Sequence, residues 1–160
     1  MALGVRLDPY LSCNFLVEIE GLVVGGFSEV SGLEVKIEVT TYREGGLNDM
    51  VHHLPGPASY PNLVLKRGLI DANLLLPWIE AVARGTIERK NGAILLLDNA
   101  HQVRMQWIFK GAYPVRWAGP DLRAHAAEVA METLELAHRG LSRPGGGLQS
   151  AASAAGGLIR

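Results

Sequence analysis

Alternation of apolar and polar residues is the clearest pattern along the chain, and it predicts a series of β-strands. In residues 33–43, for example, Val35, Ile37 and Val39 alternate with charged residues and Thr40, which gives one apolar and one polar face. The strand patterns fall at residues 15–19, 33–43, 62–68, 93–98 and 103–110. The last two are joined by a turn at residues 99–101 and predict a β-hairpin.

One segment has the spacing of an amphipathic helix. Residues 71–85 place apolar side chains on one face, and Gly85 is a typical residue beyond a helix C-terminus. Asp71 or Asn73 can cap the N-terminus, and Pro77 is tolerated only near the first turn. The expected core face consists of Leu75, Trp78, Ile79 and Val82.

Four other segments give no clear period or an ambiguous one. Residues 44–61 hold three glycines and three prolines and predict a long loop, while residues 112–122 predict an irregular link. Residues 127–138 fit both helical and strand spacing, so periodicity leaves the two alternatives open. The stretch from Ser142 onward is rich in Gly, Ala and Ser, which predicts a flexible C-terminal tail.

Composition is that of one folded domain without a strong charge preference. The 160 residues are 48% hydrophobic and 19% charged, with a formal net charge of −1. This balance gives no sign of a partner with strong negative charge, such as DNA or an anionic membrane. Cys13 is the single cysteine, so no internal disulfide is possible.

The sequence also gives no sign of export or membrane insertion. The N-terminal segment lacks an apolar run of signal-peptide length, so we expect synthesis in a cytoplasm without a signal peptide. The longest apolar stretch, residues 74–83, is about half a membrane span and contains Glu80. We therefore expect no membrane insertion by the subunit itself.

Candidate chemistry is sparse. His52 and His53 are adjacent, so in an extended segment they point to opposite sides and suit one metal ion poorly. The acidic residues Glu18, Glu20 and Glu29 are typical of solvated strand faces. The glycine-rich segment 25–32 lacks both a phosphate-loop and a nucleophile-elbow pattern. We expect no catalytic residues, no metal and no cofactor.

Several motifs resemble the tail tube family of contractile-tailed phages and extracellular contractile injection systems. They are "NFLVEIEGLVVGGFSEVSGLE", "YREGGLND", "LPGPASYPNLVLKRG", "ERKNGAILLLD" and "EVAMETLELAHRGL", in that order along the chain. The match runs from about Asp8 to Arg143. Pro77 departs from the family pattern, and so does the tail from Pro144 onward.

The resemblance implies a mainly β (α+β) fold. It would be a small antiparallel β-barrel or sandwich with one flanking helix, formed by residues 1–143, followed by the tail at 144–160. It implies that residues 127–138 contain a strand. It also implies six subunits in a ring, and rings stacked into a hollow tube for cargo or DNA. The implied partners are sheath subunits, a baseplate hub or spike, and terminator proteins. The implied location is a phage tail-like particle or virion, made in a bacterial or archaeal cytoplasm.

Two sets of residues follow as expectations for such an assembly. The polar lumen is expected on one of two strand faces, either Glu34, Lys36, Glu38 and Thr40, or Arg104, Gln106 and Lys110. The contact between rings is expected in residues 44–61 and the preceding residue. Its candidates are Arg43, Glu44, Gly45, Gly46, Asn48, Asp49, Pro55 and Gly56.

Three rival hypotheses remain at this stage. A paralogue that starts the tube at the baseplate hub would share the same motifs. A monomeric ligand-binding β-barrel predicts a closed apolar pocket, and a hydrolase built on His52 and His53 predicts turnover that is lost when they are substituted.

Overall fold

The computed structural model describes residues 14–24, 26–46, 50–69, 75–125 and 127–144. Its strands are β1 (Phe15–Ile19), β2 (Leu22–Val24), β3 (Phe27–Ser31), β4 (Lys36–Tyr42), β5 (His52–Ser59), β6 (Leu63–Gly68), β7 (Lys90–Leu97), β8 (Val103–Ala118), β9 (Met131–Ala137) and β10 (Gly140–Ser142). Its helix is α1 (Leu76–Ala83). The expected mainly β fold with one flanking helix is confirmed.

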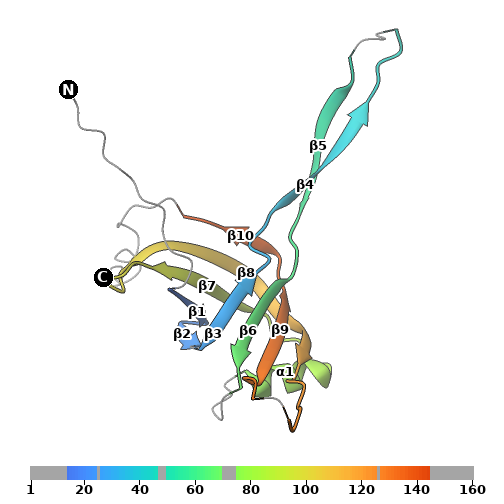
Figure 1. Cartoon of the computed structure of the whole chain (residues 1–160). Helices are drawn as coiled ribbons and strands as arrows, with labels where there is room; N and C mark the ends of the chain where they lie inside the picture. Colours follow the sequence, from blue (N-terminus) through green and yellow to red (C-terminus); the bar gives the residue numbers. More distant parts are fainter. Residues whose placement is uncertain (1–13, 25, 47–49, 70–74, 126, 145–160) are drawn as a thin grey trace, which may run out of the picture.

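All strands except β4 and β5 form one bent antiparallel sheet, in the order β2-β1-β7-β8-β9-β6-β3, with β10 also paired to β8 (Figure 1). The long strand β8 lies in the middle of this sheet and takes part in both of its halves. Its first part pairs with β7 and β10, and its last part, from Tyr113, pairs with β9. We call β2, β1, β7, β10 and the first part of β8 the first half-sheet, and the remaining strands the second half-sheet.

The two half-sheets share one hydrophobic core, which α1 covers at one end. The first half-sheet contributes Val17, Ile94 and Phe109, and the second contributes Leu65 and Leu136, all buried. Within the first half-sheet, Gly92 on β7 lies opposite Phe109 on β8, and glycine is required there because a Cβ would lie 2.3 Å from Cζ of Phe109. The helix adds Trp78, whose indole N–H donates to the carbonyl of Glu88 at 2.8 Å.

The helix begins later than its pattern predicted. It starts at Leu76 instead of residue 71, with Pro77 in the first turn, where the absent N–H costs no helical hydrogen bond. The predicted caps Asp71 and Asn73 lie outside the described residues. The predicted core face is correct, since Trp78 is buried and Ile79 and Val82 pack against the same core.

Two segments that were predicted to be irregular are strands. Residues 52–59 form β5, which pairs with β4, and residues 112–118 complete β8. Proline obscured both patterns. Pro55 is tolerated because β5 pairs on one side only, and Pro114 lies where the β8–β9 register shifts. The ambiguous segment 127–138 contains strand β9, as the family resemblance implied.

The β7–β8 turn is held by one carboxylate. Asp98 accepts the backbone N–H groups of Ala100 at 2.8 Å and Gln102 at 2.9 Å, and the Nε–H of Arg104 at 2.6 Å. The N–H of Gln102 and then the Arg104 guanidinium hold the pKa of Asp98 below its usual value. Asp98 thereby stabilises the turn expected at residues 99–101.

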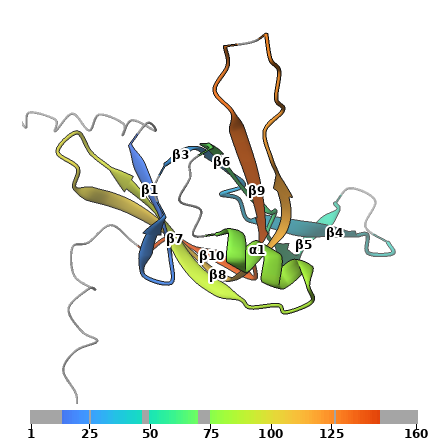
Figure 2. The same ribbon diagram turned by 90° about the horizontal axis from the view of Figure 1, so that it is seen from below.

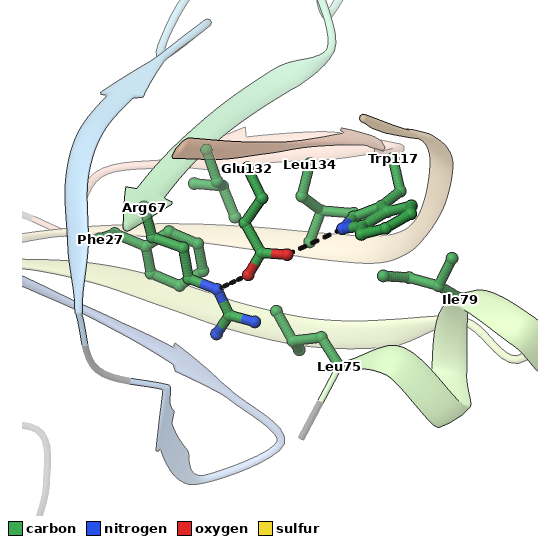
Figure 3. Close-up of a pocket in the computed structure, with 8 residues that line it drawn as sticks. Phe27, Arg67, Leu75, Ile79, Trp117, Glu132 and Leu134 are labelled. Carbon is green, nitrogen blue, oxygen red and sulfur yellow. Dashed lines mark hydrogen bonds and ion pairs between the residues drawn. The ribbon is translucent and has the colours of Figure 1, made fainter. Parts of the chain in front are cut away.

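A buried ion pair crosses the second half-sheet beneath α1 (Figure 3). Arg67 on β6 and Glu132 on β9 are direct cross-strand partners, their side chains are both only 3% exposed, and Arg67 Nε donates to Glu132. The other Glu132 oxygen accepts the indole N–H of Trp117 at 3.0 Å. Leu75 and Ile79 close the small cavity around these groups, so the charges compensate each other inside the core.

Candidate assembly surfaces

Strands β4 and β5 form a two-stranded hairpin that projects away from the rest of the molecule in both views (Figures 1 and 2). Every residue of β4 is exposed. The pattern of residues 33–43 predicted one apolar and one polar face. The alternation holds within most of β4, but the pairing adds exposed Leu54 to the face of Lys36 and Thr40, so that face is only partly polar. The fold does not place the apolar face on the core, because the core strands end at the base of the hairpin.

The apolar face of the hairpin is assembled from both strands. Ile37 lies opposite Ala58 and Val39 opposite Pro55, so these four side chains share one face. Ile37 is 56% and Val39 59% exposed. The opposite face pairs Lys36 with Ser59 and Thr40 with Leu54. The opposite face also exposes Leu54 at 51% and Tyr42 at 56% toward the tip, so apolar side chains are exposed on both faces. Exposed apolar side chains on a projecting hairpin are typical of a protein–protein contact.

The expected inter-ring residues lie on this hairpin or close to it. Arg43, Glu44, Gly45 and Gly46 follow β4 toward the tip, where Gly46 has a positive φ of 109°. Glu44 lies 3.7 Å from Nε2 of His52, a contact that becomes an ion pair when His52 is protonated. Pro55 and Gly56 lie within β5. Asn48 and Asp49 are outside the described residues.

The hairpin joins the body through two close segments, residues 32–35 and 60–62, which we call the neck. Gly32 has a φ of +88°, and a Cβ at this position would lie 2.1 Å from the carbonyl oxygen of Asn62. The neck is therefore tightly packed backbone against backbone. His138, from the β9–β10 connection, contacts it through the carbonyl of Pro61.

The expected lumen residues divide between two separate surfaces. Lys36, Glu38 and Thr40 are exposed on β4, and Glu34 is exposed in the neck. Arg104, Gln106 and Lys110 lie on β8 in the first half-sheet, on the face opposite the core residues Trp107 and Phe109. This outer face also carries half-buried Leu16, Leu95 and Ile108 beside Gln106, so it is only partly polar.

The outer face of the second half-sheet is a polar surface that the sequence pattern did not reveal. Lys66 on β6 contacts Glu29 on β3 at 3.0 Å, and Arg116 on β8 contacts Glu135 on β9 at 2.8 Å. Thr133 lies opposite Lys66 on the same face. The four charged groups form cross-strand ion pairs that sum to zero. Each lies in a different strand, so no single stretch of sequence signals the surface.

Both ends of the bent sheet are open. β3 pairs only with β6 and β2 only with β1, so each outer strand leaves one backbone edge without a partner among the described residues. Unpaired edges are sites where another chain can add a strand. A ring of subunits would provide such partners.

The candidate catalytic groups do not converge. Glu29 is paired with Lys66, and Glu20 accepts the backbone N–H of Asn91 at 3.0 Å. His52 and His53 are neighbours on the exposed strand β5. Across the described ranges, no three His, Cys, Asp or Glu side chains come together as a possible metal site.

A groove of about 270 Å³ runs between α1 and the β1–β2 hairpin. Its lining combines apolar side chains such as Ile19 and Trp78 with the charged side chains of Glu20, Glu88 and Lys90. It therefore differs from the closed apolar pocket that a ligand-binding barrel would need. Within the part of the chain that the structure describes, no helix is long and apolar enough to cross a membrane.

The bent sheet with open edges and the projecting apolar hairpin define a β-structured subunit suited to self-assembly. The sequence profile of the family described as "T4-like virus tail tube protein gp19" matches residues 11–142. The chain therefore belongs to this tail tube family, as its motifs indicated. No curated protein matches it by sequence.

Solved structures of contractile injection systems contain the same fold. A chain of the "anti-feeding prophage (AFP) baseplate, 6-fold symmetrised" is 29% identical, with 88% of this chain and 98% of that chain covered and a TM-score of 0.77. A chain of the "anti-feeding prophage cap (AFP tube terminating cap)" is 25% identical, with 90% and 99% covered and a TM-score of 0.81. A chain of the "PVC sheath-tube complex in extended state" is 24% identical, with 85% and 91% covered and a TM-score of 0.78, which shows the fold alone.

Proposed function

We propose that this chain is the repeating subunit of the inner tube of a contractile injection system or phage tail. In this proposal six copies form a ring and stacked rings enclose a lumen for cargo or DNA. The observation that carries the proposal is the projecting β4–β5 hairpin, whose apolar face has no partner within the described residues. In an isolated subunit the apolar side chains of Ile37 and Val39 are exposed to water, which is unfavourable. In a stack of rings these side chains would be buried.

The comparisons support a tube of six-membered rings. The AFP baseplate, which contains the chain that is 29% identical, is described as six-fold symmetrised. We propose the corresponding partners for this chain: sheath subunits around the tube, a baseplate hub or spike at one end, and a terminator at the other. The fold serves as a structural element without catalysis.

Rival positions within the same particle are the tube initiator at the baseplate and the terminator or cap, since one similar chain is part of a tube-terminating cap. These subunits differ from a main tube protein in copy number. An initiator or a cap forms a single layer at one end of the tube, whereas the main tube protein forms many rings along the shaft. Counting this chain in purified particles distinguishes the positions.

Electron microscopy of the purified protein tests the proposal directly. We expect rings or tubes in negative stain and a hexamer by native mass spectrometry, with lateral interfaces above about 1,000 Å². Particles extracted from the producing cells should contain many copies per shaft. Compact monomers under all conditions, together with an absence of the chain from such particles, would contradict a tube role and favour a ligand-binding barrel.

We further propose that the lumen is lined by the outer face of the second half-sheet, together with the face of the hairpin that carries Lys36 and Thr40. The ion-paired Lys66–Glu29 and Arg116–Glu135 ladders make this face polar without net charge. The outer face of the first half-sheet, with Gln106, carries leucines that suit contact with another protein.

Cysteine labelling tests this assignment. In a Cys13→Ser background, Thr133→Cys and Gln106→Cys should react equally with a bulky polymer-linked maleimide in free subunits, after correction for their exposure. In assembled tubes Thr133→Cys should become strongly protected from the bulky reagent and still react with a small maleimide that diffuses through the lumen. If Thr133→Cys in assembled tubes still reacts with the bulky reagent, the outer face of the second half-sheet lies on the exterior of the tube.

A further inference from the structure

His138 links the neck of the hairpin to the body of the subunit. The number of hydrogen bonds that it can donate depends on the protonation state of its ring. Its Nε2 lies 3.0 Å from the carbonyl oxygen of Pro61 in the neck, and its Nδ1 lies 3.1 Å from the carbonyl oxygen of Gly140 at the start of β10. The ring also stands beside Tyr60, with the ring centroids 5.6 Å apart. One side chain thus links the neck to the sheet of the body.

Both partners of the ring are carbonyl oxygens, which accept hydrogen bonds and cannot donate them. A neutral imidazole has one N–H donor, and its other nitrogen presents a lone pair. The neutral ring can therefore bond to either Pro61 or Gly140, and its second nitrogen then faces an oxygen with no proton between them. Only the doubly protonated imidazolium donates to both carbonyls.

We propose that His138 is a proton-dependent latch on the base of the hairpin. In the imidazolium form it bonds both Pro61 and Gly140, which fixes the neck against the β9–β10 connection. As pH rises and the ring gives up its second proton, one of the two bonds is lost and the neck loosens. The latch acts at the one place where the β4–β5 hairpin is joined to the body.

The charged surroundings are consistent with a switch governed by these two bonds. Arg139 follows His138 directly, and its backbone N–H donates to the carbonyl of Lys110 on β8 at 2.9 Å. From the neck the ring meets Tyr60, and among the described residues no carboxylate lies within ion-pair distance of it.

The consequence for assembly rests on the proposed tube function. If the hairpin reaches the next ring, its direction must match the surface to which it binds. A neck that is already fixed lowers the conformational entropy that is lost when the hairpin docks. The inference therefore predicts that mildly acidic conditions favour ring stacking. The latch itself is a property of the folded chain and can be measured without assembly.

Amide hydrogen exchange at about pH 5.5 and about pH 8, on either side of the range in which histidine ordinarily titrates, tests the latch. Exchange is measured for Glu34, whose N–H donates to the carbonyl of Gly32 in the neck at 2.8 Å, and for Leu63 at the start of β6, which pairs with β9. The full chain is kept at a concentration at which it is unassembled, and the rates are corrected for the intrinsic pH dependence. His138→Gln removes the titrating group and keeps a single amide donor. His125→Gln, an exposed histidine in the β8–β9 connection, is the matched control.

In the unsubstituted protein and in His125→Gln, we expect neck protection to fall about tenfold from the lower to the higher pH, the effect of losing one hydrogen bond to a charged donor. In His138→Gln protection should be independent of pH. The same protection at both pH values in the unsubstituted protein, or an unchanged pH response in His138→Gln, would overturn the latch.

A second readout separates the latch from the tube function. Tube yield on acidification is compared for the unsubstituted protein and His138→Gln. A pH response in neck exchange without tubes at any pH supports the latch and counts against the proposed function. Tubes that form equally at both pH values, together with a flat exchange response, count against the latch and leave the proposed function standing.

Discussion

Replacing Glu132 by alanine is expected to lower the free energy of unfolding by about 3–5 kcal/mol, as is typical when one partner of a buried ion pair is removed. The Arg67 side chain would remain 3% exposed with its charge uncompensated, and the indole N–H of Trp117 would lose its acceptor. A domain of this size is typically stable by about 5–15 kcal/mol, so the loss is a large fraction of the total. Urea unfolding followed by tryptophan fluorescence measures it.

Two further variants control this experiment. Glu135→Ala removes an ion pair on the outer face, where the Arg116 side chain is 64% exposed, and should cost less than about 1 kcal/mol. The double variant Arg67→Met/Glu132→Leu replaces the buried pair by apolar side chains and should recover most of the stability lost in Glu132→Ala. Equal losses for Glu132→Ala and Glu135→Ala would show that burial of the pair does not matter to stability.

The double variant Ile37→Asp/Val39→Asp is expected to abolish tube formation while single subunits stay folded. Each side chain is more than half exposed, so its replacement costs the isolated subunit little. Fully burying an aliphatic side chain of this kind contributes about 1.5–3 kcal/mol, and a charge in its place must be desolvated. Two such losses recur at every subunit along the tube, so the effect on polymerisation is large. Tube yield by sedimentation and thermal midpoint by circular dichroism measure the two properties.

The opposite face of the same strand offers a matched control. Lys36→Asp/Thr40→Asp introduces the same two carboxylates on the face shared with Ser59 and Leu54, and we expect tubes to persist. Replacement of residues 45–58 by a short Gly-Ser linker is a coarser test that also removes most of β5; single rings should form without long tubes. If Ile37→Asp/Val39→Asp assembles at normal yield, the stacking contact lies elsewhere, at the N-terminus or in residues 114–121.

The sequence by itself determined the local elements and the family. Strands such as β1, β6 and the first part of β8 follow the two-residue alternation of a sheet with one buried face, and α1 follows the helical period. Such patterns can be recognised in a sequence because side chains that face the core must be apolar. These side chains recur at every second residue of a strand and at every third to fourth residue of a helix. The motifs from "NFLVEIEGLVV" to "METLELAHRGL" established the tail tube family without any knowledge of contacts.

Only the tertiary structure decided the features on which the proposals rest. The prolines of β5 and the end of β8 concealed strands, because these segments are ordered by partners that lie elsewhere in the sequence. The Arg67–Glu132 pair joins residues 65 positions apart, and the contact between His138 and Pro61 spans 77 positions. A charged residue in a strand looks the same in sequence whether it faces solvent, a lumen or the core. Its role is set by the groups that the fold brings opposite to it, and local periodicity carries no information about those groups.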